Sequence, residues 1–357
     1  MSDERINLIV LFGGQSAEHD VSCVTAAHVL RAVDQTRFRI TPIAISRSGQ
    51  WQLATGALAS LNAGPDALPR HLDATGDTLS PTPMLAAAAA AGPVVVLPLL
   101  HGPLGEDGTV QGMLELLEVP YVGSGVLASA VGMDKAMAKE VLGFRGIPQA
   151  RWVALREHEV TPSRLAEVAA TLGLAVFVKP ANMGSSVGVS KARDLAELQT
   201  AVAHALSYDE WVVIEENIVG REIEVAVLGN LTPVASVPGE IIPGNDFYDY
   251  EDKYVEDGAQ LLIPAPLSAT DTAEVQRLAI QVYRALRCEG LARVDFFFEE
   301  GGRGFLINEV NTMPGFTPIS MYPKMWQHSG LSYSDLVSEL IDLALERHQR
   351  RRRNTGR

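Results

Sequence analysis

The sequence has 357 residues, of which 47% are hydrophobic and 20% charged, as is typical of a globular protein with room for two or three domains. Its formal net charge of −14 argues against non-specific nucleic-acid binding, which depends on neutralising phosphates. Cys23 and Cys288 are the only cysteines, so no disulfide framework is implied, and neither a signal peptide nor an apolar run of membrane-spanning length is recognisable. We therefore expect a cytoplasmic protein without membrane or nucleic-acid partners.

The first third of the chain predicts an α/β unit. Apolar runs predict buried strands at Ile6–Phe12, Phe38–Ser46 and Val94–Leu99. Helical spacing predicts helices over Val21–Asp34 and Thr109–Glu118. The first strand, helix and second strand form a strand–helix–strand unit. Residues 56–92 are rich in Ala, Gly and Pro, and we expect only poorly determined surface there.

After about residue 124 the pattern changes to a smaller α/β unit and then to a third unit. Helices are predicted over Ser129–Leu142, Asp194–Leu206, Ala269–Arg287 and Tyr333–Arg347. Strands are predicted over Ala175–Lys179, Val187–Ser190, Trp211–Glu215, Glu222–Leu228, Val234–Pro238, Leu291–Phe298 and Phe305–Val310. A long loop covers about residues 241–258. We expect domains at 1–123, 124–219 and 220–348, followed by a solvated, frayed basic tail at 349–357.

Four polar side chains interrupt the last two predicted strands. Residues two apart on a strand share a face, so Arg293 lies on one face with Asp295, and Glu309 on one face with Asn311. If these strands form a hairpin, the four groups converge within an apolar segment. Two carboxylates and an amide oxygen suit Mg²⁺, with Arg293 as the counter-charge for a substrate anion. A buried Arg–Asp–Glu salt-bridge network is the alternative that spacing leaves open.

A loop of glycines and serines, residues 183–188, follows Lys179-Pro180 at the end of a strand. Small residues let backbone N–H groups approach an anion, so this loop could cover a triphosphate with Lys179 nearby. A tight hairpin turn is the alternative. The same loop fits the G-x-S-x-G hydrolase elbow around Ser186, and residues 123–128 fit a dinucleotide fingerprint. Both matches lack the flanking elements that those motifs need.

Three further segments carry polar groups at the ends of predicted elements. Glu18 lies at a strand-to-helix turn and His101 at the end of another strand, where open α/β sheets bind ligands. Alternatively, Glu18 only caps the helix, and His101 is structural. Aromatic and charged residues at 247–254 suggest a lid or a packed surface loop. Glu215 and Glu222 lie on either side of an expected hinge near Gly220, where a nucleotide base and ribose could bind.

These segments together resemble the D-alanine–D-alanine ligases of the ATP-grasp superfamily. The motifs occur in the family's order from about Ile6 to Leu345: GGQSAEHDVS, HGPLGEDGTVQG, GMDK, VKPANMGSSVGVS, FYDYEDKY, ARVDFF and NEVNTMPGFTPIS. The resemblance implies an ATP-grasp fold, α/β with an α+β C-terminal part, preceded by a Rossmann-like domain. It also implies a homodimer and a role in peptidoglycan precursor synthesis.

The resemblance assigns residues to ATP and to the metal. It implies an ATP site made of Lys135, Lys179, Ser185, Glu215, Glu216, Ile218, Glu222, Lys253, Asn308 and Glu309. Within that set the lysines would hold phosphates, Glu215 and residues 216–218 would meet adenine, and Glu222 would bind ribose. Asp295, Glu309 and Asn311 would bind two Mg²⁺ ions, with Glu309 bridging, and Mn²⁺ could substitute.

The resemblance also assigns residues to the two amino acids. Glu18 and His101 would hold the first D-alanine, and Ser320 and Met321 would hold the carboxylate of the second. Arg293 and the backbone N–H of Gly315 would stabilise the oxyanion of the tetrahedral intermediate. Glu18, Ser185 and Tyr254 would form a hydrogen-bonded set that locks the lid. In this family, tyrosine at the Tyr254 position accompanies D-alanine as second substrate, and phenylalanine accompanies D-lactate.

The chemistry that follows is activation of a carboxylate by ATP, then attack by an amine. A competing hypothesis is a serine hydrolase that uses Ser186 and needs no ATP. Another is a non-catalytic nucleotide-binding regulator, which would be expected to lack part of the metal trio. A D-alanine–D-lactate ligase is a third, disfavoured by Tyr254. The sequence does not identify the group that deprotonates the attacking amine.

Overall fold

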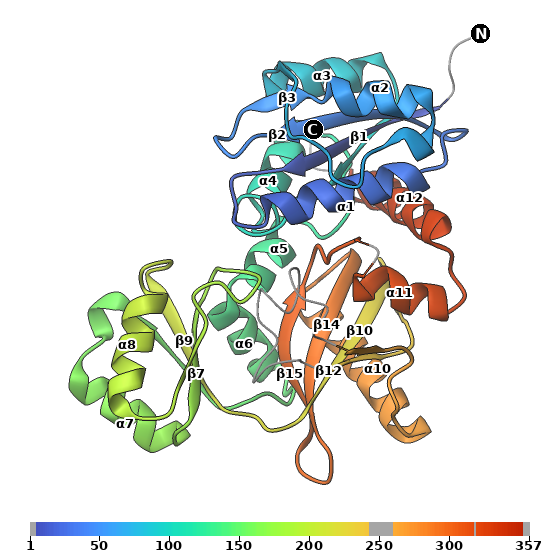
Figure 1. Ribbon diagram of the computed structural model, residues 1–357. Helices are drawn as coiled ribbons and strands as arrows, with labels where there is room; N and C mark the ends of the chain where they lie inside the picture. The colour runs from blue at the N-terminus through green and yellow to red at the C-terminus, as the bar shows by residue number, and fades with distance from the viewer. Residues whose placement is uncertain (1–4, 243–259, 318, 353–357) are drawn as a thin grey trace.

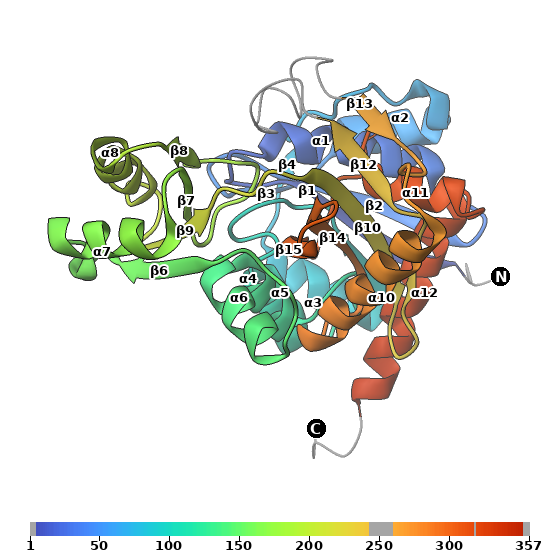
Figure 2. The same cartoon turned by 90° about the horizontal axis from the view of Figure 1, so that it is seen from below.

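The computed structural model describes residues 5–242, 260–317 and 319–352, which form three sheets with their covering helices. In Figure 1 the N-terminal unit lies above the other two, and the central unit lies beside the sheet of the C-terminal unit. Seen from below, in Figure 2, the central unit projects to one side of the rest. The α/β expectation, with an ATP-grasp arrangement in the second and third units, is confirmed.

The N-terminal sheet has the order β4-β3-β2-β1-β5. Its strands are β1 (Ile6–Gly13), β2 (Phe38–Ile45), β3 (Trp51–Leu53), β4 (Asp77–Thr78) and β5 (Val94–Pro98), and its helices are α1 (His19–Ala32), α2 (Thr55–Ala63), α3 (Pro81–Ala91) and α4 (Thr109–Leu116), with a short 3-10 helix η1 (Pro65–Ala67). Strand β1 pairs in parallel with both β2 and β5. The carboxyl ends of β1 and β5 therefore meet at one sheet edge.

The expectation of poorly determined surface over residues 56–92 is wrong. Helices α2 and α3 occupy much of it, and Leu61 and Leu85 pack into the core. The alanine run at 86–91 has a high intrinsic helix propensity, and Pro81 stands at the start of α3, where proline is tolerated. The segment looked irregular because its helices bury few side chains.

Helices α5 (Val126–Met133) and α6 (Lys135–Phe144) follow the N-terminal unit, and Ala128 and Leu142 from them pack in the core of the third sheet. A four-stranded sheet follows in the order β6-β9-β7-β8, made of β6 (Trp152–Arg156), β7 (Val176–Pro180), β8 (Ser190–Ala192) and β9 (Trp211–Glu216), with helices α7 (Pro162–Leu172) and α8 (Leu195–Ala205) and a 3-10 helix η2 (Glu157–Glu159). All pairs in this sheet are antiparallel.

Two predicted elements of this unit are corrected. The single helix over Ser129–Leu142 is two helices, because Asp134 leaves the helical conformation and its side chain caps α6 by accepting a 3.0 Å hydrogen bond from the N–H of Met137. The strand predicted at Val187–Ser190 begins only at Ser190. The preceding residues turn instead, with Val187 N–H donating to the Gly184 carbonyl.

The third sheet has the order β13-β12-β10-β14-β15, and β11 pairs with β10. Its strands are β10 (Arg221–Gly229), β11 (Val234–Ala235), β12 (Gly239–Ile242), β13 (Gln260–Leu262), β14 (Gly290–Glu299) and β15 (Gly304–Asn311), and its helices are α10 (Ala269–Ala285), α11 (Met321–His328) and α12 (Tyr333–Arg351). Among the helices in the described part of the chain, none is both long and apolar enough to cross a membrane.

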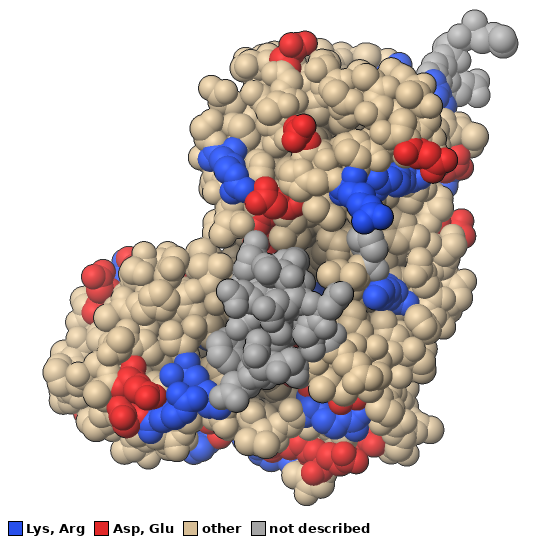
Figure 3. All heavy atoms as spheres, viewed as in Figure 1, with Lys and Arg blue, Asp and Glu red and all other residues tan. Residues whose placement is uncertain are grey.

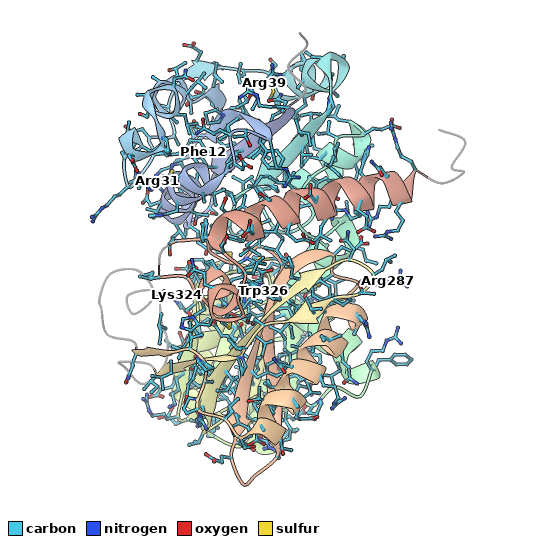
Figure 4. The ribbon with its side chains drawn as sticks, turned by 90° about the vertical axis from the view of Figure 1, so that its right-hand side faces the viewer. Phe12, Arg31, Arg39, Arg287, Lys324 and Trp326 are labelled. Atoms are coloured by element: carbon cyan, nitrogen blue, oxygen red, sulfur yellow. The ribbon has the colours of Figure 1, made fainter. Side chains whose placement is uncertain are left out.

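Helix α12 packs against the N-terminal unit and joins its core. One hydrophobic cluster contains Phe12 and Leu30 from the N-terminal unit together with Trp326 and Leu340 from α11 and α12. Figure 4 shows α12 lying between the two units, with Phe12 and Trp326 on opposite sides of it. The two ends of the chain therefore share one core.

The expected frayed tail is wrong for Arg350 and Arg351. Both belong to α12, and both pair with Glu289, while Arg351 also contacts Glu115 at 3.0 Å. The basic run therefore meets acidic groups within the chain itself, which its composition alone could not reveal. Elsewhere the surface is mixed, and Figure 3 shows acidic and basic side chains in small groups over one face.

Candidate nucleotide and metal site

Strands β14 and β15 pair as the hairpin that the sequence predicted. Arg293 lies opposite Asn311, and Asp295 lies opposite Glu309. The guanidinium of Arg293 donates two hydrogen bonds, of 2.8 and 2.7 Å, to the carboxylate of Asp295. Asn311 donates a third, of 2.9 Å, to Asp295. The four groups therefore converge on one face of the sheet.

Sequence reasoning missed a fifth member, Glu224. It lies on β10 directly opposite Asp295, is 4% exposed, and its carboxylate is 3.1 Å from Nε of Arg293. Burial alone would lower the pKa of Arg293, but the two carboxylates outweigh it and raise the pKa further above its usual value. The period-two pattern Glu222-Ile223-Glu224 on a core strand was the signal that could have revealed this residue.

The contacts of Arg293 are those of a buried salt-bridge network, the alternative that the sequence left open. The case for a metal site therefore rests on the ligand atoms that the neighbouring residues offer. Asp295 and Glu309 face each other across paired strands, with Arg293 beside Asp295. With Asn311 they offer only hard oxygen ligands, which Mg²⁺ prefers. The described residues contain no group of three or more His, Cys, Asp or Glu placed to hold a metal, since this trio includes an amide. The donor chemistry fits a divalent ion.

Buried lysines gather beside this hairpin. Lys179, at the end of β7, donates to Glu215 at 2.9 Å and to Asn308 at 3.2 Å. Lys135, at the start of α6, donates to the carbonyl of Met183 at 2.6 Å. Lys139 lies 3.1 Å from the second oxygen of Glu215. Sequence reasoning missed Lys139, although its spacing of four from Lys135 places both on one face of the helix.

The charges of this cluster are strongly coupled. Burial disfavours the carboxylate of Glu215, but Lys139 and Lys179 outweigh burial and lower its pKa to about 2. Burial lowers the pKa of Lys135. Burial also acts to lower the pKa of Lys179, but Glu215 and Glu309 outweigh it and raise that pKa. Ion pairing therefore keeps Glu215 and Lys179 charged in a dry site.

A cleft of about 490 Å³ lies between the central and third sheets, beside these charged side chains. Its lining includes these residues predicted for ATP and metal: Lys135, Lys179, Ser185, Glu215, Glu216, Ile218, Glu222, Asp295, Asn308 and Glu309. Arg293 lines it as well. The carboxylate of Glu216 is held by Arg151 at 2.9 Å and Arg303 at 2.6 Å, so the backbone is the part of Glu216 left to meet a base.

The glycine-serine loop closes one side of this cleft. Ser185 and Ser186 have positive φ angles of 49° and 59°, which non-glycine residues rarely adopt. Ser185 donates a hydrogen bond to Glu18, which joins the loop to the N-terminal unit. A Cβ on Gly184 would lie 2.9 Å from that carboxylate, so a larger residue there would require the Glu18 side chain to shift. The loop leads through turns into β8, which excludes the strand-to-helix elbow of a serine hydrolase.

Glu18 and His101 meet at the edge where β1 and β5 end. Glu18 precedes α1 but makes no capping hydrogen bond with its side chain, unlike the helix-cap alternative. His101 contacts the Met313 carbonyl through Nδ1 at 3.1 Å, and its buried Nε2 has no hydrogen-bond partner within the described residues. Burial lowers the pKa of His101, which favours the neutral ring. Both side chains remain able to receive a small polar ligand.

A second carboxylate, Glu106, lies near Glu18. It accepts a 2.8 Å hydrogen bond from the N–H of Gly102, and a Cβ on Gly184 would lie 3.9 Å from it. Burial, and then the negative charge of Glu18, raise the pKa of Glu106 to about 8. It was missed as a site residue because a single acid in a glycine-rich loop has no distinguishing spacing.

The residues predicted for the second amino acid lie at the start of α11. The hydroxyl of Ser320 accepts a 3.0 Å hydrogen bond from the N–H of Thr317, and a Cβ on Gly315 would lie 2.8 Å from that hydroxyl. The side chain of Met321 is 4% exposed and belongs to the core, so only its backbone N–H could meet a carboxylate. Lys253 and Tyr254 lie outside the described residues.

Comparisons with known proteins agree with this geometry. Residues 7–124 match the family model described as D-ala D-ala ligase N-terminus, and residues 141–342 match D-ala D-ala ligase C-terminus. The D-alanine--D-alanine ligases of Bacillus cytotoxicus and Bacillus pumilus are 45% and 47% identical, with coverage of 98% and 97% of both chains.

Solved structures agree as well. The D-alanine-D-alanine ligase from Coxiella burnetii superposes with a TM-score of 0.81 at 36% identity, covering 98% of this chain and 96% of that one. The VanG D-Ala:D-Ser ligase from Enterococcus faecalis gives 0.80 at 34% identity, covering 95% and 99%. With its cleft, its paired sheets and these relatives, the chain belongs to the D-alanine–D-alanine ligase family.

Proposed function

We propose that this protein is an ATP-dependent ligase that joins two D-alanines to D-alanyl-D-alanine for peptidoglycan precursor synthesis. The observation that carries the proposal is the single cleft in which the lysines, Glu215, Glu222 and the β14–β15 hairpin come together. Relatives that cover nearly the whole chain bear the name of this ligase. Family membership supports ATP dependence, while two Mg²⁺ ions, replaceable by Mn²⁺, are the finer part of the proposal.

The chemistry begins with a carboxylate, which is a poor acyl donor because its oxygen does not leave. Phosphorylation by ATP makes it an acylphosphate, and the protein's share is to position the groups and neutralise charge. Lys135 and Lys179 are the cations at the cleft for the phosphates. Asp295, Glu309 and Asn311 would hold Mg²⁺, which would supply further positive charge at the phosphates.

The amine of the second amino acid then attacks, and negative charge develops on the carbonyl oxygen. Arg293 lies on β14, the strand that carries Asp295, and is the cation for that oxyanion. The N–H of Gly315 is the second donor. Glu18 would pair with the ammonium of the first substrate, beside the neutral ring of His101. The hydrogen bond from Ser185 to Glu18 closes the loop over this region, which helps to exclude water from a hydrolysable intermediate.

The identity of the second substrate is the narrower proposal. Tyr254 favours D-alanine over D-lactate on family resemblance, although it lies outside the described residues. We also propose the residue roles given by the resemblance, the domain division at 123 and 219, a cytoplasmic location and a homodimer.

The decisive assay incubates the purified protein with ATP, Mg²⁺ and D-alanine, with and without D-lactate or D-serine. We expect phosphate release that depends on D-alanine, and D-alanyl-D-alanine as the product. Absence of D-alanine-dependent phosphate release would refute the proposed function. A mixed product formed in preference to the dipeptide would refute the second-substrate assignment alone.

A further inference from the structure

Lys139 is the least exposed cation near the cleft, yet it does not line the cleft itself. It lies on α6, one turn after Lys135, and is 3% exposed. Nζ of Lys139 is 3.1 Å from Oε1 of Glu215, which lies on β9 and is also 3% exposed. A lysine so deeply buried is costly, so its retention calls for a functional reason.

Glu215 is shared between two lysines from different elements. Its Oε1 faces Lys139, while its Oε2 accepts a 2.9 Å hydrogen bond from Lys179 on β7. The three groups carry two positive charges and one negative charge, so the cluster keeps a net charge of about +1. Lys179 is the member that reaches the cleft, together with Glu215. The surplus positive charge is therefore available at the cleft through Lys179.

The arrangement predicts what happens when Lys139 is removed. Glu215 would then have Lys179 as its close cation, and both carboxylate oxygens could turn to it. Lys179 would become one half of a neutral buried pair and would interact less with an incoming phosphate. Since Lys139 does not line the cleft, it would exert this effect without touching the nucleotide.

We propose that Lys139 is a positioning residue that holds one oxygen of Glu215 and so leaves Lys179 free to bind the phosphates of ATP. The inference rests on the proposed function of the cleft as an ATP site. It gives Glu215 two tasks: contact with the base and partial neutralisation of Lys179. It also explains why two lysines, rather than one, lie around a single acid.

If Lys139 only supported the fold, its replacement would lower the thermal stability of the protein. Burial lowers the pKa of Lys139, against the attraction of Glu215. Replacing it with methionine removes a buried charge and keeps a side chain of similar length, while Glu215 keeps Lys179 as its partner. Since Lys179 still compensates Glu215, no uncompensated buried charge remains, and the free energy of unfolding should not fall. A loss of ATP affinity without a loss of stability therefore separates positioning from support of the fold.

The test measures ATP binding to the full-length protein by isothermal titration without D-alanine. We expect Lys139→Met to weaken ATP binding about tenfold and to raise the KM for ATP similarly, with the KM for D-alanine changed less than about twofold. The thermal midpoint should stay equal or rise. Lys324→Met on α11, which does not line the cleft, is the control and should leave the ATP affinity, the KM for ATP and the thermal midpoint unchanged.

A second variant tests the route through Glu215. Glu215→Gln alone should weaken ATP binding, since a contact to the base is altered. In the Lys139→Met background the same change should restore part of the lost affinity, because Lys179 is released from its pair. Independent, additive losses in the double variant would overturn the proposal, as would unchanged ATP affinity or a lowered midpoint in Lys139→Met. Wild-type ATP binding without ligation would instead count against the proposed function.

Discussion

Replacement of Arg293 by methionine tests whether the β10–β14–β15 face depends on a central positive charge. The guanidinium lies 2.7 Å from Asp295 and 3.1 Å from Glu224, two buried acids directly opposite each other on paired strands. At an effective dielectric constant of about 20, each contact has a gross attraction of about 5–6 kcal/mol, most of it offset by desolvation. Breaking a buried pair typically costs about 3–5 kcal/mol, because an uncompensated charge remains.

For a chain of this length, about 1.3 °C of thermal midpoint corresponds to each kcal/mol, so we expect Arg293→Met to lower the midpoint by about 4–7 °C. Because the remaining carboxylates attract cations, added Mg²⁺ should raise the thermal midpoint more in this variant than in the wild type. Differential scanning fluorimetry with and without Mg²⁺ measures both effects.

Arg303→Met is the matched control for Arg293→Met. Arg303 pairs with Glu216 and Glu299 but is 44% exposed, so its loss should cost no more than about 1 kcal/mol and should not change the response to Mg²⁺. An Arg293→Met midpoint within about 2 °C of wild type, which corresponds to about 1.5 kcal/mol, would refute this account of the hairpin. An equal Mg²⁺ response in all three proteins would refute it as well.

Two further substitutions test the catalytic and the substrate ends of the site. Glu309→Gln should lower turnover about 100-fold while the thermal midpoint stays near that of the wild type, and near-normal turnover in a phosphate-release assay would mean that the metal site is misassigned. Glu106 has a pKa raised to about 8, so its favourable neutral form is fully present below its usual pKa of 4.5 and is lost as the pH rises through about 8. Glu106→Gln should therefore match the wild-type midpoint at pH 5 and exceed it at pH 9, and parallel midpoint curves across that range would contradict the raised pKa.

The sequence predicted those elements whose periodicity reports on burial. The hairpin of β14 and β15 is the clearest case, because alternation placed Arg293 with Asp295 before any pairing was known. Boundaries failed where capping or turns decide them: Asp134 splits one apolar helical pattern into α5 and α6, and Ser185 and Ser186 turn where a strand was expected. Residues 56–92 failed because helix propensity acts there with little burial.

The site shows a similar division. Residues within distinctive motifs were named as site candidates from the sequence, whereas Glu224 and Lys139, which pair with Arg293 and Glu215, were not. The alternation at 222–224 and the spacing of Lys139 from Lys135 were signals in the sequence, but the partners themselves are seen only when β10 and β14, or α6 and β9, are placed side by side. Likewise, Arg350 and Arg351 resembled a disordered tail until Glu289 and Glu115 appeared beside them.

Helix α12 has a consequence for how the chain acquires its fold during synthesis. The sheet of the N-terminal unit is translated before α12, with which it shares a core, and Arg37 pairs with Asp342 across that contact. Ser334 and Arg347 add hydrogen bonds to carbonyls of residues 32 and 121. The N-terminal unit therefore exposes an apolar face until α12 has been translated. A chain truncated before α12 would keep that apolar face exposed to solvent. We therefore expect it to aggregate rather than to form a smaller active enzyme.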